Sequence, residues 1–308
     1  MTEFRGVFPA IITPMDQQGE LNEEVFRVVM EFNIQAGVDG FWVAGGTGES
    51  ILLTDEENMR IAEIAADQNA GRIKNIMHVG ASTTRRAAML AENAARMGVE
   101  AICAVPPFFY AVSDEAIVEH YRVIGAAAGL PLFAYNLPPA TGVEITPDLM
   151  AKIQDGVPEI AGLKHSALNF GNIRAFRDMG LNCLSGDGPL MLAALATGAS
   201  GCVDGPLCAA PELWVEVWNA YNEGDWERAE TVQDKAASLY PAVVRNGYIG
   251  SIKAILSERL GVECGDARAP QLPLTAEQRA SIRQEVERLQ LDPVATARRH
   301  RTAEANTK

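Results

Sequence analysis

Short apolar runs recur along the first two thirds of the chain, and most of them are continuous rather than alternating with polar residues. A continuous apolar strand is buried on both faces, as in a parallel sheet. The runs therefore predict eight parallel strands, which are Val7–Ile12, Gly40–Ala44, Ile73–Val79, Ala101–Val105, Leu132–Tyr135, Ile160–Lys164, Cys183–Ser185 and Gly201–Val203.

Amphipathic stretches with helix-capping residues lie between these runs. Thr54, for example, precedes the stretch Asp55–Gln68, and Glu57 completes the pattern of a capping box. A strand followed by a helix, eight times, predicts an α/β fold of the (β/α)8 TIM barrel type. A doubly wound open sheet is the alternative, but Pro9–Met15 lacks the glycine fingerprint that usually follows its first strand. The predicted helices are Glu23–Ala36, Asp55–Gln68, Thr84–Met97, Asp114–Ala128, Pro147–Ile153, Asn172–Met179, Leu190–Thr197 and Pro211–Tyr221.

After Tyr221 the pattern predicts helices alone. These are Trp226–Tyr240, Ile249–Leu260 and Thr275–Leu289, a three-helix extension that we expect to pack on the barrel or on a neighbouring subunit. The polar end of the chain is expected to be a disordered tail. We therefore divide the chain into a barrel with the active site (1–223), a C-terminal helical extension (224–291) and a tail (292–308).

Composition narrows the functional classes. The 308 residues carry a net charge of −14, which disfavours nucleic acid as a partner but leaves room for an anionic substrate in a local pocket. No apolar run reaches the roughly 20 residues of a membrane span, and the N-terminus lacks the layout of a signal peptide. The five cysteines include no Cys-x-x-Cys pair, which argues against a zinc site or a disulfide framework. We therefore expect a cytoplasmic protein that binds neither nucleic acid nor membrane.

In a barrel of this type the active site forms where the strands end. The second predicted strand is followed by Gly-Gly-Thr-Gly-Glu-Ser at 45–50. These glycines allow backbone N–H groups and the hydroxyl of Thr47 to converge, which makes a nest for a small anion such as a carboxylate. A flexible turn is the alternative interpretation.

The sixth predicted strand ends on Lys164, and Ser166 shares its face because side chains alternate along a strand. A lysine there is either an ordinary solvated side chain or a nucleophile in a dry pocket, where the neutral amine that attacks a ketone is favoured. The fifth strand ends on Tyr135, whose phenol either shuttles protons for that reaction or packs with its hydroxyl satisfied.

Other strand ends carry further candidates. Three aromatic residues at 108–110 could wall a pocket, cross a subunit interface or pack in the core. Gly186 follows the seventh strand, and Val203 ends the eighth strand just before Gly205, so main-chain carbonyls could approach a ligand closely at both places. None of the four histidines has the spacing of a metal ligand with Asp, Glu or Cys.

Four motifs stand together in order along the chain: Gly-Gly-Thr-Gly-Glu-Ser at 45–50, Tyr-Asn-Leu-Pro at 135–138, Gly-Leu-Lys at 162–164 and Ser-Gly-Asp at 185–187. With them, the chain resembles the dihydrodipicolinate synthase / N-acetylneuraminate lyase family from about Phe4 to Leu289. The resemblance implies a (β/α)8 barrel, a class I mechanism without metal or cofactor, and a homotetramer built as a dimer of dimers. It also implies that Lys164 forms a Schiff base with pyruvate or another 2-keto acid, that Tyr135 relays the proton, and that Gly46 and Thr47 hold the carboxylate.

Departures from the family pattern bear on the second substrate. The synthase branch has a threonine where this chain has Gly46, a tyrosine that crosses to the neighbouring subunit at Phe109, and an acceptor-binding arginine at Ala140. Tyr110 stands next to Phe109 and is the alternative crossing residue. These differences argue against a lysine-pathway synthase.

The resemblance to the sialic acid lyase branch is also incomplete. It shares the apolar position at Ala140 and the hydroxyl at Ser166, but its acidic sugar contacts fall on Gly188 and Pro189, and its later serine on Gly205. We therefore expect an acceptor end that is less polar than in either branch, lined by Phe108, Phe109, Leu137, Pro139 and Ala140.

The sequence thus predicts a Schiff-base aldolase or lyase acting on a 2-keto acid, with pyruvate as product or donor. The alternative is a Schiff-base dehydratase or deaminase of a 2-keto-3-deoxy sugar acid or a cyclic imine. A keto-acid binder without activity is a third hypothesis, and the presence of a nucleophile argues against it. The predicted catalytic residues are Lys164, Tyr135 and Thr47, and the predicted substrate-binding residues are Gly46, Thr47, Ser166, Gly186, Val203, Phe109, Tyr110 and Ala140.

Overall fold

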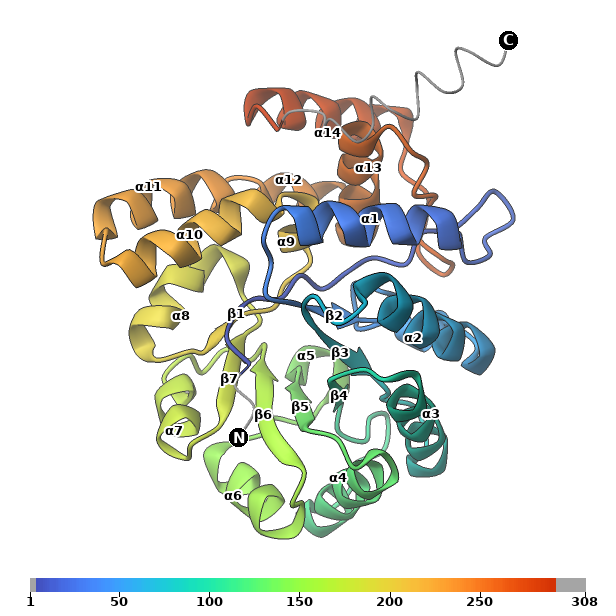
Figure 1. The fold of residues 1–308 in the computed structure, drawn as a ribbon, viewed down its shortest axis with the longest axis vertical. Helices are drawn as coiled ribbons and strands as arrows, with labels where there is room; N and C mark the ends of the chain where they lie inside the picture. The colour runs from blue at the N-terminus through green and yellow to red at the C-terminus, as the bar shows by residue number, and fades with distance from the viewer. Residues whose placement is uncertain (1–3, 292–308) are drawn as a thin grey trace.

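The computed structural model describes residues 4–291, and this part of the chain contains eight parallel strands in one sheet (Figure 1). Neighbouring strands follow in the order β1-β8-β7-β6-β5-β4-β3-β2, so each strand from β2 to β7 pairs with the next along the chain, and β1 pairs with β8. The predicted barrel architecture is confirmed. The strands are β1 (Gly6–Val7), β2 (Gly40–Val43), β3 (Lys74–His78), β4 (Ala101–Ala104), β5 (Leu132–Asn136), β6 (Ile160–His165), β7 (Asn182–Ser185) and β8 (Gly201–Cys202).

The barrel closes where the segment after β1 meets β2. Ala10 and Trp42 form a parallel bridge. The Trp42 amide donates to Pro9 O at 3.0 Å, and the Ile11 amide donates to Trp42 O at 3.2 Å. These bonds satisfy the backbone groups that would otherwise be exposed at two sheet edges.

Helices follow the strands and cover the outside of the barrel (Figure 1). Several begin as their sequence predicts; Thr54 and Glu57, for example, form the complete capping box of α2. The short helices α5 and α9 lie in loops where no helix was predicted, and each begins with a proline in its first turn. The barrel helices are α1 (Glu23–Gln35), α2 (Asp55–Asn69), α3 (Thr84–Met97), α4 (Asp114–Ala128), α5 (Pro138–Thr141), α6 (Pro147–Gly156), α7 (Asn172–Asp178), α8 (Met191–Thr197), α9 (Pro206–Ala209) and α10 (Pro211–Glu223).

The C-terminal part differs from prediction in one element. The segment predicted as a single helix over Trp226–Tyr240 divides into α11 (Trp226–Ala237) and α12 (Tyr240–Asn246). Pro241 has no N–H to donate to the preceding turn, so a continuous helix would lose a hydrogen bond there. The extension continues with α13 (Tyr248–Leu260) and α14 (Ala276–Arg288).

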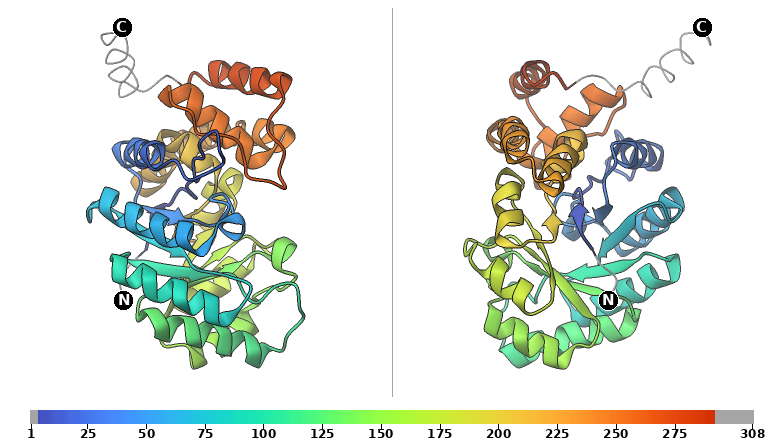
Figure 2. Two further views of the ribbon diagram at one scale, coloured as in Figure 1. Left: turned by 90° about the vertical axis from the view of Figure 1, so that its right-hand side faces the viewer. Right: turned by 60° about the vertical axis from the view of Figure 1, so that its left-hand side comes forward.

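The extension packs on the barrel, as expected. Helix α13 contacts α9 and α1, and both views of Figure 2 show the C-terminal helices together at one end of the molecule. No helix within residues 4–291 is long and apolar enough to cross a membrane. The predicted tail, 292–308, lies outside the described residues.

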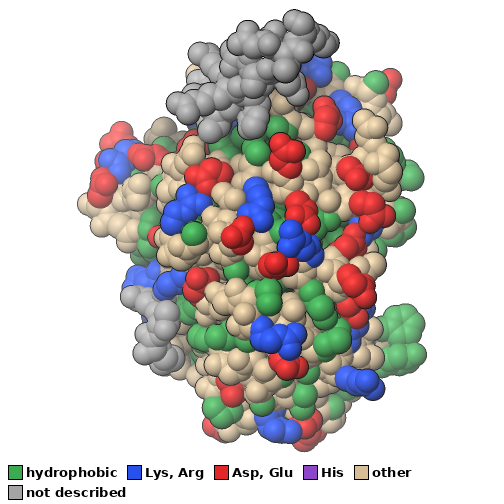
Figure 3. Space-filling view, turned by 45° about the vertical axis from the view of Figure 1, so that its right-hand side comes forward, with side chains coloured by type: hydrophobic (Ala, Val, Ile, Leu, Met, Phe, Trp, Pro, Cys, Tyr) green, Lys and Arg blue, Asp and Glu red, His purple; other side chains and the backbone are tan. Residues whose placement is uncertain are grey.

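Apolar side chains form two layers. One lies between the sheet and the helices, and the other fills the barrel. The inner layer includes Phe8, Trp42, Phe133, Tyr135 and Leu184. On the outer surface, acidic and basic side chains lie side by side rather than in one patch on the face seen in Figure 3. The apolar barrel interior therefore excludes water from below any site at the strand ends.

The buried histidine of α4 makes stability depend on pH. His120 is 3% exposed, with Nδ1 2.9 Å from Thr84 Oγ1. Burial lowers the pKa of His120 to about 4, below its value of about 6.5 in the unfolded chain. The unfolded chain binds more protons between these values, so the free energy of unfolding falls as the pH drops from about 6.5 to about 4.

We expect His120→Gln to remove this contribution. Between pH 7 and pH 4 the variant should lose about 3 kcal/mol less unfolding free energy than the wild type. Urea unfolding at several pH values measures how the free energy of unfolding of each protein changes with pH. The same change in both proteins would show that His120 does not titrate on unfolding.

Candidate active site

A pocket of about 480 Å³ opens at the carboxyl ends of the strands. It brings together residues from the ends of β2, β5, β6 and β7 that are far apart in the sequence. The predicted site residues that line it are Gly46, Thr47, Tyr135, Lys164, Ser166 and Gly186.

Lys164 stands near the end of β6 and is 4% exposed. Its register partner on β5 is Tyr135. The Lys164 Nζ lies 4.6 Å from the centre of the Tyr135 ring and 5.5 Å from that of Trp42. Among the described residues no carboxylate forms an ion pair with Lys164. The lysine is therefore a dry side chain surrounded by aromatic rings, and not the solvated strand-end lysine of the alternative interpretation.

The loop after β2 is folded tightly by its glycines. A Cβ atom on Gly48 would lie 2.8 Å from the Ala44 Cα, which is backbone and cannot move aside easily. At Gly46 a Cβ atom would meet only the Tyr135 hydroxyl, at 3.7 Å. The loop thus lies against Tyr135, and Thr47 is placed in the wall of the same pocket.

The C-terminal extension supports this loop from behind. Glu49, in the left-handed conformation at φ 63°, forms an ion pair with Lys253 of α13 at 2.6 Å, and both side chains are fully buried. Burial lowers the pKa of Lys253, and the Glu49 carboxylate opposes that shift. The Arg268 amide also donates to Glu49 at 2.6 Å. This loop, residues 45–50, which we call the nest loop, is therefore held by residues more than 200 positions away in the sequence.

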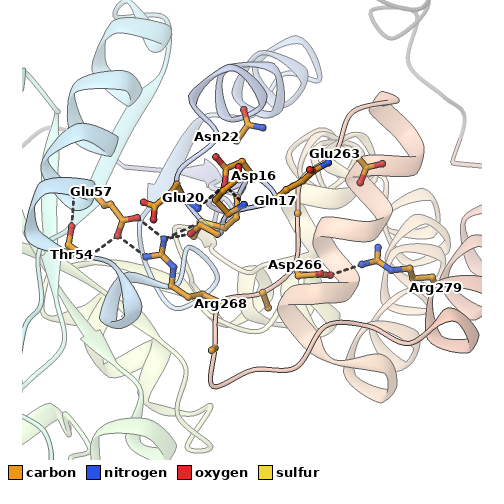
Figure 4. Close-up of a pocket in the computed structure, with 16 residues that line it drawn as sticks. Asp16, Gln17, Glu20, Asn22, Thr54, Glu57, Glu263, Asp266, Arg268 and Arg279 are labelled. Atoms are coloured by element: carbon orange, nitrogen blue, oxygen red, sulfur yellow. Dashed lines mark hydrogen bonds and ion pairs between the residues drawn. The ribbon is translucent and has the colours of Figure 1, made fainter.

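A larger cleft, of about 1190 Å³, lies on the far side of this support. Figure 4 shows Arg268 reaching to Glu57 at the start of α2, and Asp266 paired with Arg279. The Arg268 guanidinium lowers the pKa of Glu57. Arg268 and Arg279 are each paired with a carboxylate, and the described residues that line the cleft include no lysine. The smaller pocket, which contains Lys164, is therefore the candidate active site.

The far wall of the pocket is polar. Asp204, after β8, accepts hydrogen bonds from the Gly188 amide at 2.9 Å, the Gly205 amide at 2.8 Å and the Tyr248 hydroxyl at 2.5 Å. Burial and this carboxylate hold the pKa of Tyr248 well above its usual range. Partial burial and Asp204 also raise the pKa of Asp187. The Asp204 carboxyl group is thus held in place by three hydrogen bonds, and Asp187 is a second carboxyl group in the same wall.

This wall differs from the apolar acceptor end expected from the sequence. Of the five residues expected there, only Leu137 lines the pocket of the single chain. Phe109 and Tyr110 project into solvent, 87% and 75% exposed, with their rings 4.9 Å apart. Ala140 is exposed on α5, and Val203 is buried inside the barrel.

The sequence reasoning did not single out four other residues that line the pocket, which are Asp187, Asp204, Tyr240 and Tyr248. Asp187 and Asp204 each lie two residues beyond the end of a strand, β7 and β8, and that position alone could have marked them. Tyr240 and Tyr248 also line the pocket, but they come from α12 and α13, and no sequence signal pointed these helices at the strand ends.

No group of three or more His, Cys, Asp or Glu side chains within residues 4–291 is arranged to hold a metal ion.

Comparison with known proteins places this geometry in context. The sequence model of the dihydrodipicolinate synthetase family matches residues 3–289. A 4-hydroxy-tetrahydrodipicolinate synthase of Phenylobacterium zucineum is 33% identical over 285 residues, covering 91% of this chain and 95% of that protein. An N-acetylneuraminate lyase of Shigella boydii is 32% identical over 258 residues, covering 83% and 86%. The solved structure of CdNal from Clostridium difficile in complex with mannosamine matches with a TM-score of 0.89 and 28% identity, covering 94% and 100%.

The glycine geometry of the nest loop leads to a prediction. Gly48→Ala should destabilise the protein by about 1–3 kcal/mol, because its Cβ atom meets backbone and forces the loop to shift. Gly46→Ala is the matched control and should unfold like the wild type, because its Cβ atom makes an ordinary contact. Urea unfolding compares the two, and equal stabilities would contradict the assigned geometry.

Proposed function

Since this chain belongs to the dihydrodipicolinate synthetase family, we propose that Lys164 is the Schiff-base lysine of its 2-keto acid chemistry. The family identity makes the chain a class I lyase or aldolase that acts with pyruvate. The observation that carries the proposal is the dry position of Lys164 beside Tyr135 and the nest loop.

The first step joins the lysine to the keto acid. The neutral Lys164 amine attacks the ketone carbon, and the carbinolamine that forms loses its hydroxyl as water. Tyr135 relays the proton that this leaving hydroxyl needs. The backbone N–H groups and hydroxyl at Gly46 and Thr47 hold the substrate carboxylate, which orients the ketone toward Nζ.

The protonated iminium then acts as an electron sink. Loss of a proton from the adjacent carbon of bound pyruvate gives an enamine, which attacks an aldehyde to form a C–C bond. The reverse sequence cleaves that bond and releases the aldehyde before pyruvate. No metal ion is needed for either direction, because the iminium supplies the positive charge.

The far wall supports a substrate whose second half is uncharged and bears hydroxyl groups. Asp187 and Asp204 disfavour a second carboxylate, and Lys164 is the only Lys or Arg among the pocket residues of the described chain. Asp187 can accept hydrogen bonds from hydroxyls at that end. This argues against the acceptor of a lysine-pathway synthase, as the exchange of arginine for Ala140 does.

A Schiff-base dehydratase is the second candidate, and Asp187 is the observation that favours it. A carboxyl group with a raised pKa can donate the proton that a departing hydroxyl requires. The same pocket would then expel water from a 2-keto-3-deoxy sugar acid.

We also propose that the enzyme works in the cytoplasm as a homotetramer, a dimer of dimers. All five cysteines are free thiols, which suits a reducing compartment. The exposed rings of Phe109 and Tyr110 support a subunit interface at the β4–α4 loop. Light scattering would return the mass of four chains, and the mass of one chain would refute the assembly.

Borohydride reduction in the presence of pyruvate tests the lysine. The wild type should gain the mass of one reduced pyruvyl group per chain, and Lys164→Ala should gain none. Tyr135→Phe should form the same adduct at least about tenfold more slowly, because the proton relay contributes roughly 10²–10⁴-fold. Intact-mass spectrometry over time measures both.

Lys253→Met is unsuitable as a control because it breaks a buried ion pair, so the exposed Lys152→Ala serves instead and should react like the wild type. An adduct that survives in Lys164→Ala would overturn the assignment of the nucleophile.

A substrate panel separates the two reactions. Uncharged hydroxylated 2-keto acids should release pyruvate if the enzyme is an aldolase, or water without C–C cleavage if it is a dehydratase. Analogues with a second carboxylate should react at least tenfold more slowly, and Asp187→Asn should reduce that discrimination. Efficient turnover of the dicarboxylates would refute the charge argument.

A further inference from the structure

Trp42 occupies the position where the barrel closes and the pocket begins. It is fully buried on β2, and its backbone forms the hydrogen bonds with Pro9 and Ile11 that join the two sheet edges. Its indole ring packs edge to face on Tyr135, with ring centres 5.5 Å apart and an interplanar angle of 79°. The same ring has its centre 5.5 Å from the Lys164 Nζ.

The indole is not held by its polar atom. Trp42 Nε1 is buried and has no hydrogen-bond partner among the described residues. The edge of the ring instead meets the nest loop, where a Cβ atom on Gly45 would lie 2.7 Å from Nε1. A buried tryptophan usually finds a partner for its N–H group, so packing and the ring face, not a hydrogen bond, account for this residue.

The Lys164 nitrogen lies near two aromatic rings, and no anion in the described part of the chain forms an ion pair with it. We propose that Trp42 is a positioning residue for Lys164: its ring, together with that of Tyr135, holds the nitrogen at the floor of the pocket and stabilises the positive charge of the iminium. This inference rests on the proposed function of Lys164. The attraction between a cation and the face of an indole is strongest where water is excluded, as it is here.

This role has a signature that packing alone lacks. At low pH the free lysine is an ammonium, so the ring stabilises the free enzyme and the iminium alike. At high pH the free lysine is neutral and only the iminium is a cation. Removing the ring should therefore weaken iminium formation at high pH far more than at low pH.

The titratable groups near Lys164 do not obscure this pH dependence of iminium formation. Burial lowers the pKa of His78 to about 4 and raises the pKa of the Cys103 and Cys202 thiols well above the usual range. The other titratable groups that line the pocket with Lys164 are His165, the phenols of Tyr135, Tyr240 and Tyr248, and the carboxylates of Asp187 and Asp204. They are present in both matched variants below, so their titration cancels in the comparison.

The test compares Trp42→Met with Trp214→Met. Trp214, on α10, is also fully buried with an unpartnered Nε1, but it is not among the rings near Lys164. Pyruvate is titrated from pH 6 to about pH 11, which lies above the ordinary lysine pKa of about 10.4, and the adduct is trapped with borohydride and measured by intact mass. Relative to wild type, Trp42→Met should bind pyruvate about 2- to 30-fold more weakly at the high end and near equally at the low end. Trp214→Met should show no such pH dependence.

Tryptophan fluorescence provides a second test that can be used if Trp42→Met does not fold. Pyruvate should change the emission of the wild type and of Trp214→Phe, and Trp42→Phe should lose that change. A pH-independent loss in Trp42→Met, or a pyruvate response that persists in Trp42→Phe, would overturn the inference while leaving the proposed function intact. A wild type that forms no adduct would overturn both.

Discussion

The exclusion of water from the barrel interior is the condition on which the site depends. The parallel bridge between Ala10 and Trp42 closes the sheet, and the inner apolar layer then seals the floor beneath Lys164. An amine in such a place cannot rely on solvent to carry its charge. The rings of Trp42 and Tyr135 lie next to the nitrogen, and within residues 4–291 no carboxylate forms an ion pair with it.

The two ends of the pocket carry different polar groups. At the near end, backbone N–H groups of the nest loop and the lysine suit an anion. At the far end, Asp204 is fixed by two amides and a phenol, and Asp187 lies beside it. The proposed function therefore gives a keto acid one favoured orientation, which we propose places its carboxylate toward Thr47 and its remaining carbons toward α12 and α13.

Periodicity and motif order were enough to predict the barrel, the strand ends and the lysine with its tyrosine, because each depends on local sequence. Tyr240 and Tyr248 could not be predicted, because their place depends on how α12 and α13 pack across the strand ends. The apolar acceptor end stays a prediction: it was assembled from residues close to the motifs, whereas the pocket of the single chain also takes Tyr240, Tyr248 and Ile249 from the last third of the chain. Pro241 was visible in the sequence, and its effect on the helix before it was overlooked.

The buried ion pair between Glu49 and Lys253 has a consequence for how the protein can be divided. A buried charge left without its partner costs several kcal/mol, so a barrel severed after α10 would contain an uncompensated carboxylate directly behind the nest loop. The helical extension is therefore not an appendage added to a finished catalytic unit. Barrel and extension form one indivisible module, and grafting the strand-end loops onto another barrel would have to carry α13 with them.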